Sequence, residues 1–402
     1  MAKRRSRTSR PSSLREWRQR FDEVNVREKK IDIYTVLDGL SDTTNDYSEM
    51  ERQFRGGKVR LIDPVDSISR NLPRSAKYRH DRQSLFEQLL NDGDAPAISV
   101  VIPVVVGRKT ALRECLASLQ RQTFVLNHPS KVEIVLVQDG IATAHRNPLS
   151  KDVMDQVRQF RKYRVFRLNP TSLSDSKRRA TARNVGVFYS SHGIVFFVDS
   201  SMVLERNFLA EHVLRHARTT GSIALIGFKQ NIYPKEYRKL SSRIRDGDEM
   251  PKYIKDWKWK HGYMQRSNWL RSLRGTAKIG RSPLVRFFHT GVTSVRLDKV
   301  KDVGGFHSSF DGYWGMEDTF LGALLVANGT KLVPCPSSVA YMIKHREAKR
   351  SRDEFDLARN RSQYERRLNT ALRSYRFQIL RRHIQKLRST GVLELIEQRP
   401  HR

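Results

Sequence analysis

The stretch Ile98-Ser-Val-Val-Ile-Pro-Val-Val-Val106 decides the fold, and two later runs repeat its character: Val132-Glu-Ile-Val-Leu-Val-Gln138 and Ile194-Val-Phe-Phe-Val198. Short, continuous apolar runs of this kind are typical of strands buried on both faces of a parallel sheet. A further, weaker strand and two helices are predicted in the intervals, at 163–168, 110–122 and 175–191. Because strands alternate with helices, we predict an α/β fold with a mostly parallel central sheet flanked by helices.

Two acidic residues follow predicted strands directly. Asp139 comes after the second run and Asp199 after the third. Ligands of open α/β sheets bind beyond the carboxyl ends of the strands, where both acids would lie. The helix between them begins with a basic, polar run that contains Lys177, Arg178 and Arg183. Cationic side chains at a helix N-terminus, together with its free N–H groups and dipole, can bind a diphosphate.

A second group of candidate residues lies in Trp314-Gly-Met-Glu-Asp318. A Trp beside a flexible Gly can offer an apolar face to a sugar ring, and the carboxylates of Glu317 and Asp318 can bind the hydroxyl groups of that sugar. The alternative is structural, because Asp318 could cap the helix predicted at 319–328. Both interpretations stay open at this point.

Five segments, taken in order, resemble the family-2-type inverting glycosyltransferases of the GT-A fold, which include polypeptide N-acetylgalactosaminyl-, β-1,4-galactosyl- and chondroitin-type enzymes. The segments are Ile98-Ser-Val-Val-Ile-Pro103, Ile134-Val-Leu-Val-Gln-Asp-Gly140, Ala182-Arg-Asn-Val-Gly186 with Val195-Phe-Phe-Val-Asp-Ser-Ser201, Gly304-Gly-Phe306 and Tyr313-Trp-Gly-Met-Glu-Asp318. The resemblance implies transfer of a hexose or N-acetylhexosamine from a nucleotide diphosphate sugar, with a UDP-sugar favoured. A hydroxyl acceptor would attack with inversion, in glycan or polysaccharide synthesis.

The resemblance also implies a donor site formed by Pro103, Asp139, Arg183 and Asp199. Asp139 would hydrogen-bond the base, and Arg183 would lie near the ribose or diphosphate. Asp199 would sit at a Mn²⁺ or Mg²⁺ ion, with His345 as a second metal ligand. The motif Asp199-Ser-Ser201 departs from the family pattern, which ends in an acid or His, and serine is a poor metal ligand beside carboxylate or imidazole.

On the acceptor side, the resemblance makes Asp318 the general base and lets Glu317 position a sugar hydroxyl, with Trp314 and Gly315 lining the acceptor. The chemistry is consistent, because attack by a hydroxyl group requires one carboxylate to take its proton. A single base predicts direct displacement, without the carboxylate nucleophile that retaining glycosidases use.

Composition changes along the chain predict three parts. Residues 1–94 form a basic, partly disordered extension, 95–350 form the GT-A domain, and 351–402 form a basic helical tail. Within the domain, 231–283 is a basic, aromatic insertion that could form an acceptor groove, a lid or a small packed subdomain. The tail contains a predicted amphipathic helix at 368–395, which could bind an anionic membrane or dock against the domain.

The charge balance keeps other functions open. The chain has 76 Lys and Arg residues against 42 Asp and Glu, a formal net charge of +34 that favours polyanionic partners. A nucleic-acid-binding protein is therefore the main alternative, and a GT-A scaffold with weak catalysis is another. The two cysteines cannot form a disulfide framework, and no apolar run reaches the ~18 residues of a membrane-spanning helix. We expect a cytoplasmic protein that can bind peripherally to a membrane.

Overall fold

A computed structural model of the chain describes residues 30–32, 60–62, 95–105, 109–139, 149–169, 178–219, 221–232, 285, 288–343, 358–364, 366–367 and 377–399. The predicted aromatic insertion beyond residue 232, Lys177 and His345 lie outside these residues. Among the helices that the structure describes, none combines the length and the apolar composition that a membrane crossing requires.

The described part of the chain contains one large sheet and one small one. The small sheet pairs β1 (Lys30–Asp32) in parallel with β2 (Arg60–Ile62). The strands of the large sheet are β3 (Ile98–Val105), β4 (Val132–Asp139), β5 (Lys162–Leu168), β6 (Ile194–Phe197), β7 (Met202–Leu204), β8 (Ile223–Ile232), β9 (Thr293–Arg296), β10 (Lys331–Ile343) and β11 (Leu393–Arg399).

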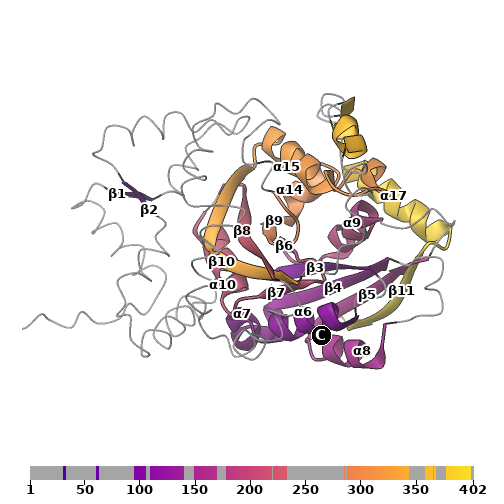
Figure 1. Ribbon diagram of the computed structural model, residues 1–402, viewed down its shortest axis with the longest axis horizontal. Helices are drawn as coiled ribbons and strands as arrows, with labels where there is room; N and C mark the ends of the chain where they lie inside the picture. The colour runs from indigo at the N-terminus through magenta and orange to yellow at the C-terminus, as the bar shows by residue number, and fades with distance from the viewer. Residues whose placement is uncertain are drawn as a thin grey trace, which may run out of the picture.

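The large sheet has nine described strands in the order β11-β5-β4-β3-β6-β9-β8-β10-β7 (Figure 1). Strands β5, β4, β3 and β6 are paired in parallel, and so are β8 and β10, whereas β7, β9 and β11 pair antiparallel to their neighbours. Six of the nine therefore run in one direction. The predicted α/β fold with a mostly parallel central sheet is confirmed.

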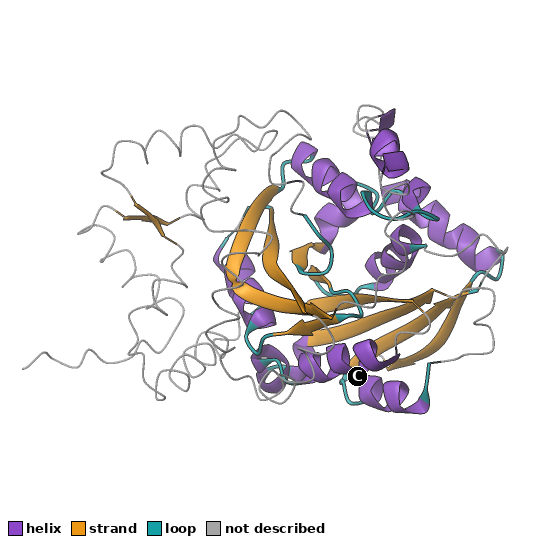
Figure 2. Ribbon diagram, in the orientation of Figure 1, coloured by secondary structure: helices purple, strands orange, loops and turns teal. Residues whose placement is uncertain are grey.

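Helices cover both faces of the sheet (Figure 2). The helices are α6 (Lys109–Gln120), α7 (Thr123–Asn127), α8 (Lys151–Arg158), α9 (Arg179–Tyr189), α10 (Phe208–Arg218), α14 (Leu297–Asp302), α15 (Glu317–Ala327) and α17 (Phe377–Ser389), with short 3₁₀ turns at Pro129–Lys131 and Ser308–Phe310. Successive strand residues point to opposite faces. Val100 and Ile102 accordingly join the core formed with α6, α8 and α10, while Val101 joins the core formed with α9, α14, α15 and α17.

Helix α9 lies unusually close to the central strand β3. A Cβ atom on Gly186 would lie 2.2 Å from Cγ1 of Val101, which is a distance that only glycine allows. The close approach fixes the height of α9 above the sheet. The residues at the start of this helix thereby lie above the carboxyl ends of the parallel strands.

The C-terminal part of the chain also packs against the sheet. Helix α17 buries Leu380 and Ile384 in the core, and β11 extends the sheet beside β5. The predicted helix to residue 395 is wrong in its extent, because α17 ends at Ser389 and the chain turns at Gly391, whose φ is 69°. Glycine in this left-handed conformation is a common helix stop. The predicted domain boundary at residue 350 stays a prediction.

Candidate functional site

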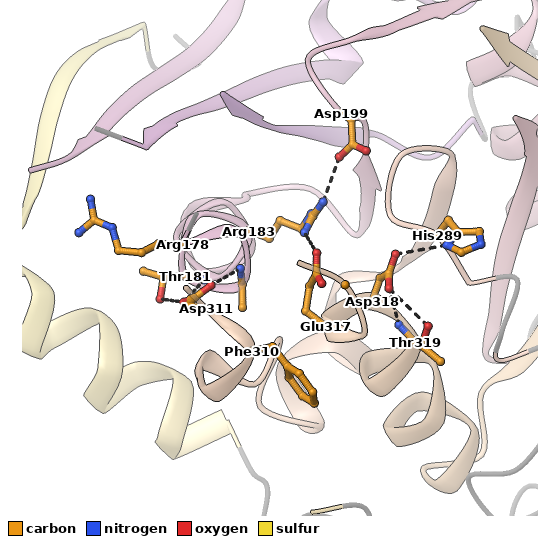
Figure 3. Close-up of polar contacts among 12 residues, drawn as sticks. Arg178, Thr181, Arg183, Asp199, His289, Phe310, Asp311, Glu317, Asp318 and Thr319 are labelled. Atoms are coloured by element: carbon orange, nitrogen blue, oxygen red, sulfur yellow. Dashed lines mark hydrogen bonds and ion pairs between the residues drawn. The ribbon is translucent and has the colours of Figure 1, made fainter. Parts of the chain in front are cut away.

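A buried arginine on α9 connects two acidic residues from different parts of the fold (Figure 3). Arg183 Nη2 donates to Asp199 Oδ1 at 3.0 Å, and Asp199 lies two residues after the end of β6. Its Nη1 donates to Glu317 Oε1 at 2.9 Å, and Glu317 is the first residue of α15. Arg183 is only 4% exposed. The guanidinium thus joins the two halves of the sequence-predicted site.

The electrostatics keep this cluster charged but incompletely bonded. Burial alone would lower the pKa of Arg183, but the charges of Asp199 and Glu317 raise it, so the guanidinium stays cationic. Burial and the charge of Asp318 raise the pKa of Glu317 against the opposing charge of Arg183. Glu317 Oε2 is buried and accepts no hydrogen bond from any described residue. A buried acceptor without a donor is costly, so this oxygen is suited to a ligand hydroxyl.

Asp318 uses its two carboxylate oxygens differently. Its Oδ1 accepts a hydrogen bond from the backbone N–H of Thr319 at 2.7 Å, and its Oδ2 lies 3.4 Å from His289 Nδ1. Burial would raise the pKa of Asp318, but the hydrogen bond and charge of His289 and the charge of Arg183 lower it to about 2. Asp318 is the second residue of α15, whose N-cap is Met316, so Oδ1 binds an N–H of the first helical turn rather than capping a helix that begins at Thr319. Oδ2 is the oxygen beside His289. His289 carried no signal in the sequence.

The backbone turns sharply just before these two acids. Gly315 has a φ of 89°, and Met316, with a φ of 74°, is the one non-glycine residue with a positive φ in the described part of the chain. A non-glycine residue in this region costs roughly 1–3 kcal/mol and persists only where its surroundings hold it. The turn directs Glu317 and Asp318 toward Arg183. Trp314 is exposed on the preceding loop.

Asp139 binds Arg178 and is not part of the Arg183 cluster. Its Oδ2 accepts the backbone N–H of Arg178 at 2.7 Å, and its Oδ1 accepts Nε of the same residue at 3.0 Å. The rest of the Arg178 guanidinium donates to the carbonyls of Leu168 and Asn169. Arg178 points away from Arg183 on the opposite flank of α9 (Figure 3). In this structure Arg178 is committed to Asp139 rather than free for a diphosphate.

The N-terminus of α9 is also occupied. Asp311 accepts hydrogen bonds from the backbone of Ala180 at 2.8 Å and of Thr181 at 3.1 Å, and from the Thr181 hydroxyl at 2.6 Å. The prediction that these helix N–H groups are free for a diphosphate is therefore wrong for Ala180 and Thr181, because an acid from the acceptor-side loop already holds them. Burial raises the pKa of Asp311 to about 7 despite these hydrogen bonds.

The fit of a metal ion depends on Asp199. No group of three or more His, Cys, Asp or Glu residues suited to a metal occurs among the described residues. Asp199 Oδ1 is paired with Arg183, whereas Oδ2 lies beside Gly291, where an added Cβ would stand 3.0 Å away. The glycine leaves space at this oxygen. One carboxylate oxygen is therefore available to a divalent cation.

The structure brings together part of the predicted site. Arg183, Asp199, Glu317 and Asp318 form one cluster. Pro103 lies in β3 opposite Val137, beyond Val101, the last residue that pairs with β6. A proline has no N–H for a ladder, so it fits a strand position where pairing on one side has ended.

Comparison with known proteins gives one family match. Residues 99–280 match the family model described as Glycosyl transferase family 2. No curated protein sequence gives a significant match to the chain.

Among solved structures, the chain is similar to S. aureus TarS. The crystal structure of S. aureus TarS matches at 16% identity and a TM-score of 0.38, covering 62% of this chain and 37% of that chain. The crystal structure of S. aureus TarS 1–349 in complex with UDP-GlcNAc matches at 16% identity and a TM-score of 0.41, covering 73% of this chain and 74% of that chain.

Proposed function

We propose that the chain, of which residues 99–280 match the family model, is a glycosyltransferase that transfers a hexose or N-acetylhexosamine from a nucleotide diphosphate sugar to a hydroxyl acceptor with inversion. A UDP-sugar is the favoured donor, and the product belongs to glycan or polysaccharide synthesis. The observation that carries the proposal is the cluster in which Arg183 joins Asp199 to Glu317, with Asp318 next along α15.

Arg183 would serve the leaving group. Negative charge develops on the diphosphate as its bond to the sugar breaks. A cation that two carboxylates already hold in place needs no rearrangement when that charge appears, and burial strengthens the attraction. The position of Arg183 beside Asp199 supports this role, because Asp199 follows the carboxyl end of β6, where ligands of α/β sheets bind.

Asp318 would act as the general base and Glu317 as the residue that positions a sugar hydroxyl. Asp318 is ionised at neutral pH, so its Oδ2 can accept the proton of the attacking hydroxyl. A carboxylate with a low pKa is a weak base, so we expect the proton to move only after the hydroxyl oxygen has begun to bond to the sugar. The unpaired Oε2 of Glu317 supports the positioning role.

The remaining donor contacts belong to Asp139, Pro103 and a metal ion. Each Asp139 oxygen accepts one hydrogen bond from Arg178 and has a second lone pair that could meet a donor on the base. Asp199 Oδ2 would bind Mn²⁺ or Mg²⁺, with His345 as the second protein ligand. Such an ion would supply further stabilisation of the diphosphate charge.

A donor screen tests the proposal. Purified full-length protein is incubated with UDP-, GDP- and TDP-sugars, with Mn²⁺ or with EDTA, and released nucleoside diphosphate is measured. We expect release from one donor and loss of release in Asp199→Ala. Asp298→Asn is the matched control, because Asp298 is an exposed acid on α14. Loss with EDTA supports the metal site, whereas unchanged release with EDTA contradicts it.

Two other outcomes would contradict the proposal in different ways. Absence of release and of thermal stabilisation by every nucleotide would contradict the donor site and favour nucleic-acid binding, whose affinity falls steeply with salt. Thermal stabilisation by a nucleotide without release, across a panel of hydroxyl acceptors, would favour a scaffold that binds donors without turnover.

A further inference from the structure

We propose that Asn360 is a positioning residue for Glu317 and Asp318, and that it acts through the backbone of the loop that precedes them. The inference rests on the proposed function for the role of the two acids. Asn360 belongs to the helical residues 358–364, more than forty positions along the chain from these acids and outside the matched family domain.

The side chain of Asn360 is fully buried and holds two backbone carbonyls of this loop. Its Nδ2 donates to Gly315 O at 2.7 Å and reaches Phe310 O at 3.5 Å. The Oδ1 atom is buried and accepts no hydrogen bond from the described residues. An apolar side chain would avoid the cost of that unpaired oxygen. The amide is therefore explained by the two carbonyls that it binds.

The stronger of these hydrogen bonds falls where the loop is strained. The Gly315 carbonyl belongs to the peptide unit that joins Gly315 to Met316, and both residues have a positive φ. The orientation of this peptide unit determines where α15 begins, and α15 begins with Glu317. A left-handed Met relaxes unless its neighbours hold it. Asn360 supplies a hydrogen bond that does so at the peptide unit itself.

Two further contacts join residues 358–364 to the same loop and helix. The Arg359 guanidinium lies 3.6 Å from the centre of the Tyr313 ring, before the turn. The Tyr364 ring meets Phe320 edge to face at 5.7 Å, after the turn. Cation–π and edge-to-face contacts of this kind are attractive. The segment thus holds the chain on both sides of the two acids and leaves Trp314 exposed between them.

Apart from the bond from Arg183 to Glu317, the donor-side residues of the cluster have anchors of their own. Arg183 lies on α9 and Asp199 follows β6, and both elements are packed in the main core. Loss of the Asn360 hydrogen bonds should let Met316 relax and displace Asp318 while the donor-binding residues keep their places. The expected signature is a lower kcat with an unchanged donor KM.

The test compares Asn360→Asp with Ser362→Ala in the full chain. Aspartate keeps the shape of asparagine, and its ionised carboxylate cannot donate to a carbonyl. Ser362 is an exposed residue of the same helical segment. We expect Asn360→Asp to lower kcat by about 10-fold or more, as small misplacements of reacting groups do. We expect the donor KM to stay within about twofold, because donor binding is not touched. Ser362→Ala should match the wild type.

A second readout does not require activity. Hydrogen exchange, followed by mass spectrometry on peptides that cover 313–320, should be faster in Asn360→Asp and unchanged in peptides from α9. If Asn360→Asp is poorly folded, Arg359→Ala, which removes the contact with Tyr313, should give the same pattern at about one third of the size.

The outcomes separate the two proposals. If the wild-type protein is active and Asn360→Asp has the same kcat, or if hydrogen exchange at 313–320 is unchanged, the role of Asn360 is overturned. A wild type without turnover on any donor overturns the proposed function, and the exchange data still decide whether Asn360 fixes the loop. Faster exchange together with a lower kcat and a constant donor KM supports the positioning role.

Discussion

Two buried arginines on opposite flanks of α9 have very different surroundings: Arg178, the N-cap residue of the helix, and Arg183 within it. Arg178 donates to Asp139 and to two backbone carbonyls, so its flank is complete without a ligand. Arg183 joins Asp199 to Glu317, but its own Nε and Glu317 Oε2 meet no partner among the described residues. Similar charges in the sequence thus give a closed salt bridge on one flank and an unfinished site on the other.

The largest effect should come from removing the cation of the unfinished flank. Arg183→Met keeps most of the side-chain volume but leaves Asp199 and Glu317 without their partner. We expect the free energy of unfolding to fall by about 3–5 kcal/mol, as for other broken buried pairs, and turnover to be lost. Chemical denaturation and donor turnover measure both. Arg161→Met, at an exposed position, is the control. A loss of stability equal to that of the control would show that the flank needs no cation.

Replacing the proposed base should lower turnover more than stability. Asp318→Asn keeps an oxygen that can accept the Thr319 N–H but cannot take a proton. We expect kcat to fall by about 100- to 10,000-fold, the range for loss of a general base. The free energy of unfolding should fall by on the order of 2 kcal/mol, because the amide gives up the interactions with His289 and Arg183 that lower the pKa of Asp318. Steady-state kinetics on the donor found in the screen make the measurement, with Asp298→Asn as control. Turnover at the wild-type level would limit the role of Asp318 to its hydrogen bond in the first turn of α15.

Removing the arginine of the closed flank should also lower stability, but it should change donor KM rather than kcat. Arg178→Met leaves Asp139 buried and unpaired, so we expect a loss of stability of about 3 kcal/mol. Donor KM should rise, because Asp139 would lose the contacts that orient it toward the nucleotide base of the donor. The kcat should change little, because the nucleotide base is remote from the reacting atoms. Kinetics and denaturation on the same preparation test this. A fall of kcat as large as in Arg183→Met would erase the distinction between the flanks.

The sequence predicts the parallel half of the sheet well, because β3, β4 and β6 are buried on both faces and read as continuous apolar runs. It fails where local signals mislead. From the sequence, the apolar runs at 331–333 and 339–343 predict two separate closing strands, with two prolines between them. The structure has one strand with an irregularity between Cys335 and Val339, and this bulge accommodates the interruption.

The site is predictable in its residues but not in its pairings. Asp199, Glu317 and Asp318 are found from their motifs, yet the contact between Arg183 and Glu317 joins residues 134 positions apart and exists only once the sheet is assembled. His289 and Asp311 belong to no motif. Their roles follow from the fold alone, since each becomes significant through the side chain or helix that lies opposite.

The smallest effect concerns Asp311, which connects the acceptor-side loop to the start of α9 between the two flanks. Burial raises its pKa from 3.8 to about 7 in the folded protein. The folded state therefore holds this proton over a range of pH where the unfolded chain has released it, so the contribution of Asp311 to stability is largest below pH 4 and is lost as the pH rises through 7.

Relative to Asp311→Asn, which cannot titrate, the wild type should lose on the order of 1 kcal/mol or more between pH 5 and pH 8. Urea denaturation of both proteins at these two pH values measures the difference, and Asp302→Asn, at an exposed acid, gives the baseline. Parallel pH dependence of the wild type and Asp311→Asn would mean that the three hydrogen bonds from Ala180 and Thr181 outweigh burial and keep the carboxylate ionised.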